Sequence, residues 1–410
     1  MSSTAGLIFG LASLVTSLVL GPGSARAQEG AAIPIGEAEL FPSVRIDYLS
    51  DDNVRLVDED EARESGSQVV LSPTAELVAR RRLLDIRVRY DGRYSNGAED
   101  PQDFDDHSLG LNVQARIDRR RLLVFDAVYR LGHQPFGFGL TEGRTDLVDE
   151  PAEYGEYVVG GRFRYGVPDA RGNLEAGLRF FGRRYTNLEQ FSDGRDYQRI
   201  VPYGLFSYRL SGDTRALLEL RYATHSEESG LNDRDSVSLF GGLAFAATGR
   251  LRGEFRVGAT STDYQDENRD DLTIAAAEAG LRYAIREYVT LGLDAERSLD
   301  DTGTRRDDGT AVRQTIADTL TLSWDQEWSS RISHDAYVRR IARDRECPSA
   351  SSSSLSAGLE VDYAVRRWLT FGASIGAETR DADVCEGAEE ERSDLEFDRR
   401  LIGAHVRVSL

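Results

Sequence analysis

The chain has 410 residues, of which 40% are hydrophobic, and a formal net charge of −20. Its strongly basic side chains are all arginines, because the sequence contains no lysine. After residue 20 there is no uncharged apolar run of about 18 residues, which excludes a membrane-spanning helix from the rest of the chain. The length alone would suggest two or three domains, but no linker, low-complexity tract or change of composition divides the sequence.

The first 27 residues have the organisation of a secretory signal peptide. An uncharged apolar core spans Leu7–Leu20, and Gly21–Gly23 interrupts it. Ala25–Ala27 then provides a small-x-small cleavage site before Gln28. We therefore expect residues 1–27 to be removed during secretion.

The segment Leu84–Tyr94 shows most clearly how the mature chain is built. Its apolar side chains alternate with charged ones; the apolar set is Leu84, Ile86, Val88, Tyr90 and Tyr94, and the charged set is Asp85, Arg87, Arg89, Asp91 and Arg93. Successive residues of a strand point to opposite faces, so one face of this strand is apolar and the other is heavily ionised. Antiparallel sheets with one face in water also show this alternation. The length of the segment and the density of charge on its polar face set it apart, and a sheet with lipid outside and water inside would produce this pattern.

The same alternation recurs to the end of the chain and predicts eighteen strands. They cover residues 42–49, 68–79, 83–94, 107–117, 122–132, 154–166, 173–185, 197–210, 215–225, 235–246, 251–262, 272–284, 289–299, 314–326, 331–341, 354–364, 369–379 and 397–410. Most of them have the length of a tilted strand that crosses a bilayer.

The connections between these strands alternate strictly between short and long. The long ones, such as 50–66, 132–156 and 380–396, are rich in acidic residues and glycine. Together the nine long connections carry a net charge of −31, and the rest of the mature chain carries a net charge of +10. Outer-membrane barrels have an even number of strands, short periplasmic turns, longer external loops and no free edge.

We therefore predict an all-β fold: a transmembrane antiparallel up-and-down β-barrel of about 18 strands, with short periplasmic turns and long acidic extracellular loops. Residues 28–41 would form a short periplasmic segment, and residues 42–410 a single barrel domain. This places the protein in the outer membrane of a Gram-negative cell, in contact with lipid and lipopolysaccharide.

Aromatic residues occur at both ends of the expected strands. Trp324, Trp328, Trp368 and Tyr288 lie at or beside short turns, whereas Tyr94 and Tyr129 lie towards the opposite strand ends. Aromatic belts at the two membrane interfaces would produce this distribution.

By strand phase, a large set of charged side chains should face an aqueous lumen. The expected pore-lining arginines are Arg87, Arg89, Arg93, Arg116, Arg130, Arg162, Arg164, Arg179, Arg221, Arg252, Arg256 and Arg282, with Arg407 near the chain end. The expected acidic partners are Asp85, Asp91, Asp126, Glu175, Glu219, Glu254, Glu278, Asp294, Glu296, Glu360 and Asp362. These groups either neutralise one another around the wall, or leave some arginines free to bind carboxylate, phosphate or sulfate groups of a solute.

The longest connection, 132–156, contains an aromatic and glycine-rich stretch from His133 to Gly139. A loop of this size is either an ordinary external loop or one that folds inward as a constriction. In the second case His133, Phe136 and Phe138 are the residues that we expect at the constriction.

Cys347 and Cys385 are the two cysteines, and both lie in polar loops that we expect on the same rim. A Cys347–Cys385 disulfide is permissible in a secreted protein, and two separate free thiols are the alternative.

No arrangement typical of an enzyme occurs in the sequence. The histidines are His107, His133, His225, His334 and His405. The adjacent pair His225 and Ser226 would point to opposite faces of a strand, which is poor geometry for a base and a nucleophile. There is also no phosphate-binding loop and no zinc-ligand spacing, so we expect no catalytic site, no metal and no cofactor.

The first expected strand and its exit, Val44–Val54, resemble the start of a family of outer-membrane β-barrel porins associated with exopolysaccharide synthesis and export systems. The resemblance rests on the stretch Asp51–Val54, which reads Asp-Asp-Asn-Val, and it extends over the mature chain only as architecture. It implies a conduit for a sugar polymer that works with periplasmic export components. The chain departs from the pattern at Leu410, where such barrels commonly end in an aromatic residue.

Three functional hypotheses follow. The first is a passive conduit for exported polysaccharide, the second a general diffusion porin for small solutes, and the third a structural or adhesive barrel whose acidic loops bind cations. We expect no nucleic-acid partner, and the sequence leaves the oligomeric state open. Energy for transport must come from elsewhere, because no nucleotide-binding motif occurs.

Overall fold

The computed structural model describes residues 32–57, 63–97, 102–142, 145, 147–167, 169–266, 270–300, 315–345, 351–383 and 396–410. The expected signal peptide, Cys347 and Cys385 lie outside these residues, so cleavage and the disulfide stay predictions. Among the described residues, no helix has both the length and the hydrophobicity needed to span a bilayer.

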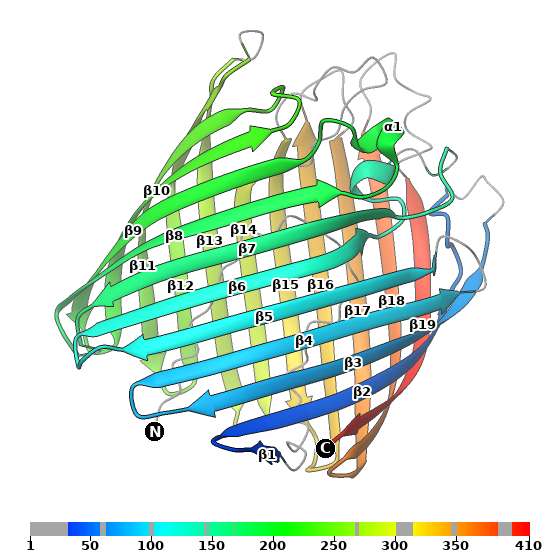
Figure 1. The fold of residues 1–410 in the computed structure, drawn as a ribbon, viewed down its shortest axis with the longest axis horizontal. Helices are drawn as coiled ribbons and strands as arrows, with labels where there is room; N and C mark the ends of the chain where they lie inside the picture. Colours follow the sequence, from blue (N-terminus) through cyan, green and yellow to red (C-terminus); the bar gives the residue numbers. More distant parts are fainter. Residues whose placement is uncertain are drawn as a thin grey trace.

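Eighteen long strands form one closed antiparallel barrel (Figure 1). They are β2 Ala38–Asp51, β3 Gly66–Arg80, β4 Leu84–Gly97, β5 Phe104–Arg116, β6 Arg121–Gln134, β7 Ala152–Tyr165, β8 Gly172–Tyr185, β9 Tyr197–Ser211, β10 Thr214–Glu227, β11 Arg234–Thr248, β12 Leu251–Tyr264, β13 Leu272–Arg286, β14 Val289–Asp300, β15 Thr315–Glu327, β16 Ile332–Arg345, β17 Ser351–Arg366, β18 Leu369–Asp383 and β19 Phe397–Ser409. Each strand pairs with its neighbours in sequence, and β2 pairs with both β3 and β19, which closes the sheet. The prediction of an eighteen-stranded up-and-down barrel is confirmed.

The first strand differs from the prediction at its start. β2 begins at Ala38 rather than at residue 42, and a short extra strand, β1 (Ile33–Ile35), pairs with Ala38–Leu40. The pairing of β19 with β2 reaches only Ser43. The backbone of β2 before that point would be an unpaired edge, and β1 covers it.

Burial in this barrel is reversed relative to a water-soluble β-protein. Large apolar side chains are exposed on the outer face; Leu239, Val257 and Ile402 are 53%, 60% and 64% exposed. Charged side chains are buried inside, where Glu219 and Arg183 are only 4% and 6% exposed. Strand alternation therefore presents the apolar face to lipid and the ionised face to the lumen.

The short turns lie at the same end of the barrel as the start of β2 and the end of β19 (Figure 1). The turn between β5 and β6 is held by Asp118, whose carboxylate accepts hydrogen bonds from the side chain of Arg121 and from the backbone of Arg120 and Arg121. The hydrogen bond from the Arg121 side chain lowers the pKa of Asp118, and the backbone hydrogen bond from Arg120 adds to this. A local side-chain hydrogen bond of this kind is what sets a tight turn.

Both short helices lie at the opposite end, in the long connections. They are η2, a single 3-10 turn at Gly139–Thr141, and α1, Glu189–Ser192. The strand order places the described ends of the long connections on this same rim, as predicted.

The tryptophans mark the short-turn interface. Trp324, Trp328 and Trp368 are 43%, 63% and 50% exposed on the outer face. The indole Nε1 of Trp328 donates a hydrogen bond of 2.7 Å to Nδ1 of His334, and Trp324 contacts the same ring edge-on. Amphipathic rings in this position suit the boundary between lipid and water.

Replacing Leu109 by Arg should lower the free energy of unfolding by about 2–4 kcal/mol, because the guanidinium would face lipid near the middle of β5. Leu109 is 54% exposed on the outer face. Urea titration of the protein folded in lipid vesicles, followed by tryptophan fluorescence, measures the change.

The matched control is Gln114→Arg on the same strand. Gln114 lies opposite Asp85 on the inner face, so the new charge gains a carboxylate and stays hydrated. Its effect should stay below about 1 kcal/mol, as for an exposed ion pair. Equal destabilisation by both variants would contradict the assignment of the two faces.

Candidate functional site

The pairing register places the expected pore-lining arginines on the inner face, and eight of them lie within 4.0 Å of a carboxylate. These arginines are Arg87, Arg89, Arg93, Arg130, Arg164, Arg221, Arg256 and Arg282. Arg221 and Arg256 each have more than one acidic partner, and the full set of partners is Glu76, Asp91, Asp106, Glu156, Glu175, Glu219, Glu278, Glu254 and Asp294. Within the described part of the chain, the other four have no carboxylate within 4.0 Å: Arg116, Arg162, Arg179 and Arg252. Mutual neutralisation therefore accounts for most of the inner arginines, and four are left over.

The densest ion-pair network lies on β10, β12 and β13. Glu278 binds both Arg221, at 2.5 Å, and Arg256, at 3.2 Å, and Glu219 binds the same two arginines at 2.6 Å each. Glu254 also accepts a hydrogen bond from Arg256. Three carboxylates thus surround two guanidinium groups, all of them largely shielded from water, which makes this part of the wall rigid.

A cavity of about 280 Å³ lies on a different part of the inner wall, over β4 to β9. Four of the expected pore-lining arginines meet there, namely Arg87, Arg89, Arg162 and Arg179. Its remaining lining combines Tyr203 and Phe181 with small or apolar residues, namely Gly110, Leu111, Val128, Val158, Gly160 and Gly161, and with the polar pair Asn112 and Asp126. Glycines at the wall leave the space into which the longer side chains project.

Two of the four cavity arginines are not compensated by acidic side chains. Among the described residues, no carboxylate lies within 4.0 Å of Arg162 or Arg179, and Nε of Arg162 is buried without a hydrogen-bond partner. The guanidinium of Arg179 lies over the ring of Tyr203, 5.6 Å from its centroid. Asp126, the acidic residue of the lining, accepts a hydrogen bond from Asn112. The cavity is therefore a positively charged pocket with an aromatic wall.

The connection between β6 and β7 folds over towards the far part of the rim. Phe138 is 5% exposed and packs edge-on against Phe397 of β19, with ring centroids 6.0 Å apart. Arg380 of β18 lies under Phe138, 4.5 Å from the ring centroid, and donates a hydrogen bond of 3.4 Å to the carbonyl of Gly137. β2 to β5 separate β6 from these partners in the sheet, so the loop reaches across that part of the barrel mouth.

Glycine and glutamine residues fix the conformation of this loop. Gly137 and Gly139 have φ angles of +76° and +63°, which favour glycine. The side-chain oxygen of Gln134 accepts a hydrogen bond of 2.9 Å from the backbone of Leu140. Phe136 is also buried, whereas His133 stays at the wall, stacked on Phe104 and 2.7 Å from Asp106. Of the three expected constriction residues, His133 does not reach across the mouth.

The loop after β2 joins the same assembly. Leu56 packs with Phe138 and Phe397 in one buried cluster. Arg55 binds Glu64 at 2.7 Å and Asp149 at 3.2 Å, which ties this loop to the β6–β7 connection. The hydrogen bond to Glu64 raises the pKa of Arg55.

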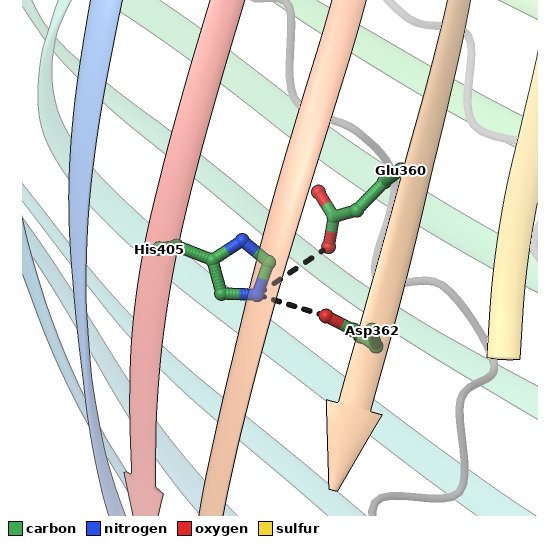
Figure 2. Close-up of side chains that lie close together, drawn as sticks. All are labelled: Glu360, Asp362 and His405. Carbon is green, nitrogen blue, oxygen red and sulfur yellow. Dashed lines mark ion pairs between the residues drawn. The ribbon is translucent and has the colours of Figure 1, made fainter. Parts of the chain in front are cut away.

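A second group of titratable side chains lies on the inner wall near the β19–β2 closure. Glu360 and Asp362 of β17 face His405 of β19, as Figure 2 shows. Nε2 of His405 is 2.9 Å from the Asp362 carboxylate and 4.0 Å from that of Glu360. The strand phase predicted Glu360 and Asp362 in the lumen, but the sequence could not predict their contact with His405, because that contact depends on the register of three strands.

The family described as Putative beta-barrel porin 2 matches residues 27–319. The chain belongs to this family. No functionally curated protein matches the sequence.

Solved structures similar to this chain include outer-membrane porins of low sequence identity. OpdQ of Pseudomonas aeruginosa is 10% identical, with 92% of this chain and 99% of that chain covered and a TM-score of 0.47. A BenF-like porin of Pseudomonas fluorescens Pf-5 is 11% identical, with 92% and 100% covered and a TM-score of 0.47. OccK2 of Pseudomonas aeruginosa is 14% identical, with 91% and 98% covered and a TM-score of 0.45.

The family and the closed barrel together make this protein an outer-membrane, porin-like channel of a Gram-negative cell. Porins of this architecture are typically channels rather than enzymes. The family match and the sequence pattern therefore indicate the same class of protein, an outer-membrane channel. The cavity and the folded β6–β7 loop are the features that bear on which solutes pass through it.

Replacing Arg256 by Met should lower the free energy of unfolding by about 3–5 kcal/mol, because it leaves three shielded carboxylates around one guanidinium. The matched control is Arg121→Met, since Arg121 pairs with Asp118 at the short turn between β5 and β6, where both side chains are about half exposed. That pair should contribute little to stability, because water screens an exposed ion pair. Urea titration in vesicles measures both, and equal effects would show that the network does not stabilise the barrel.

Proposed function

We propose that this porin is a passive conduit for an acidic sugar polymer. The observation that carries the proposal is the positively charged cavity on the inner wall, where Arg162 and Arg179 have no acidic partner among the described residues. A guanidinium binds a carboxylate through two parallel hydrogen bonds, so an uncompensated arginine in a lumen attracts an acidic solute.

The rest of the lining suits a sugar ring beside that carboxylate. Tyr203 and Phe181 offer apolar ring faces next to the arginines. A saccharide has both polar edges and less polar C–H faces, so charged and aromatic groups side by side bind both parts. Arg87 and Arg89 are already paired with wall carboxylates, so only part of the positive charge of the cavity would hold the polymer. Conduction requires binding that is weak enough for the chain to move on.

Export would also need a polymer source and periplasmic components that deliver the chain to the barrel. The family resemblance of the first strand supports this role, and the short-turn end of the barrel is where such components would dock. Lipid and lipopolysaccharide would surround the apolar outer face.

The folded β6–β7 loop favours a second candidate, a diffusion porin for small acidic solutes. A loop held over part of the mouth by Arg380 and Phe397 narrows the opening. A narrow opening suits monosaccharides and other small anions better than a thick polymer.

The deciding measurement is single-channel conductance of the refolded protein in a planar bilayer, with and without oligogalacturonate as an acidic oligosaccharide. Reversible block by the oligosaccharide supports the conduit. Block by galacturonate monomer with no effect of the oligomer supports the diffusion porin. Indifference to both contradicts a role for the cavity in acidic-sugar transport.

The double variant Arg162→Gln/Arg179→Gln should weaken block by about tenfold or more, since charge-assisted hydrogen bonds contribute about 1.5–3 kcal/mol each. The control, Arg116→Gln/Arg252→Gln, removes two inner-face arginines that do not line the cavity. It should leave the block unchanged. The same loss in both variants would mean that total lumen charge, rather than the cavity, binds the solute.

Deletion of residues 136–141 should raise the single-channel conductance, because it removes the part of the loop that crosses towards β18 and β19. Deletion of residues 229–232, in the β10–β11 connection on the same rim, serves as the control and should not change it. An unchanged conductance after the first deletion would rule out a constriction at this loop.

A further inference from the structure

The group formed by Glu360, Asp362 and His405 has the composition and closeness of a metal-ligand set. One donor atom from each residue lies within 4.8 Å of the other two, and the residues are only 6%, 6% and 3% exposed (Figure 2). One imidazole and two carboxylates that converge in this way are common ligands of divalent transition metals.

Hydrogen bonding inside the protein does not account for these atoms. Both ring nitrogens of His405 and Oδ1 of Asp362 are buried without a hydrogen-bond partner. Nε2 and Oδ1 are 2.9 Å apart, a contact that is an ion pair only when the imidazole is protonated. Buried polar atoms left unsatisfied are costly and rare. Nε2 of His405 and Oδ1 of Asp362 face each other, as Figure 2 shows, so one cation bound to both atoms would satisfy them.

A glycine on the intervening strand makes the convergence possible. Gly372 of β18 pairs with Asp362 on one side and with His405 on the other. A Cβ at this position would lie 2.5 Å from Nε2 of His405 and 2.6 Å from Oδ1 of Asp362. Any other residue would therefore fill the space between the two donor atoms.

The surrounding charge favours a cation. Five carboxylates gather here, those of Asp47, Asp325, Asp335, Glu360 and Asp362, and they face the two guanidinium groups of Arg45 and Arg407. Arg45 of β2 binds both carboxylate oxygens of Glu360, at 3.0 and 3.1 Å, which orients that ligand. The carboxylates outnumber the guanidinium groups, and a divalent ion would offset this excess.

We propose that Glu360, Asp362 and His405 bind a divalent transition-metal ion of the Zn²⁺ class. The set is too small, and too rich in nitrogen, for Ca²⁺, which takes six to eight oxygen ligands. The ion joins β17 to β19 across β18, and Arg45 extends the link to β2. It therefore ties together the strands beside the closure between the two ends of the chain.

The test uses the full mature protein, refolded without metal and titrated with Zn²⁺ against a fluorescent zinc indicator. Wild-type protein should bind one Zn²⁺ per chain. Binding should be at least about tenfold weaker in His405→Gln and in Asp362→Asn, because each removes one of three ligands. Gly372→Ala should lose the site as well, since the methyl group occupies it.

The control is Glu175→Gln, which removes another buried inner-wall carboxylate on the opposite part of the barrel. It should bind Zn²⁺ as the wild type does. Zn²⁺ should also raise the thermal unfolding temperature of the wild type and of this control, and leave the ligand variants unchanged, because an ion that binds the folded state stabilises it.

Absence of Zn²⁺ binding by the wild type would overturn the proposal, and so would binding by His405→Gln with unaltered affinity. Asp362→Asn keeps the shape of the side chain, so it decides the question if His405→Gln does not refold.

Discussion

The closure of the sheet between β2 and β19 is the constraint on which the structure depends. In hydrocarbon a backbone N–H or C=O without a partner costs several kcal/mol, so a membrane-spanning sheet cannot have an open edge. The register between the two terminal strands runs from Ser43 to Asp51 and joins the ends of the chain. Beyond it, the hydrogen bond from Leu410 to the carbonyl of Pro42, together with β1, covers what remains of the β2 edge.

Closure also determines where the charged groups must go. Lipid takes the apolar face, so guanidinium and carboxylate groups line the lumen, where they compensate one another or stay available to solutes. Two parts of the inner wall differ in how far their arginines are compensated by carboxylates. β10, β12 and β13 hold a dense network in which each arginine has several acidic partners. β4 to β9 form a cavity in which Arg162 and Arg179 have none among the described residues.

Much of this architecture could be predicted from the sequence, because a period of two and an alternation of loop lengths are local signals. The apolar face of Leu84–Tyr94 and the phase of the inner arginines are examples. The start of β2 was wrong by four residues, since the apolar pattern weakens where β1 takes over the pairing. The contact of Phe138 with Arg380, and that of His405 with Asp362, could not be predicted, because residues far apart in sequence meet only once strand register is set.

The position of the tryptophans has a practical consequence for spectroscopy of this channel. Trp324, Trp328 and Trp368 all lie at the short-turn end and none lies at the loop-bearing rim. Intrinsic tryptophan emission is therefore a local probe of one membrane interface. During insertion it reports when that interface becomes dry, and in the finished barrel it separates events at the periplasmic mouth from events at the cell surface.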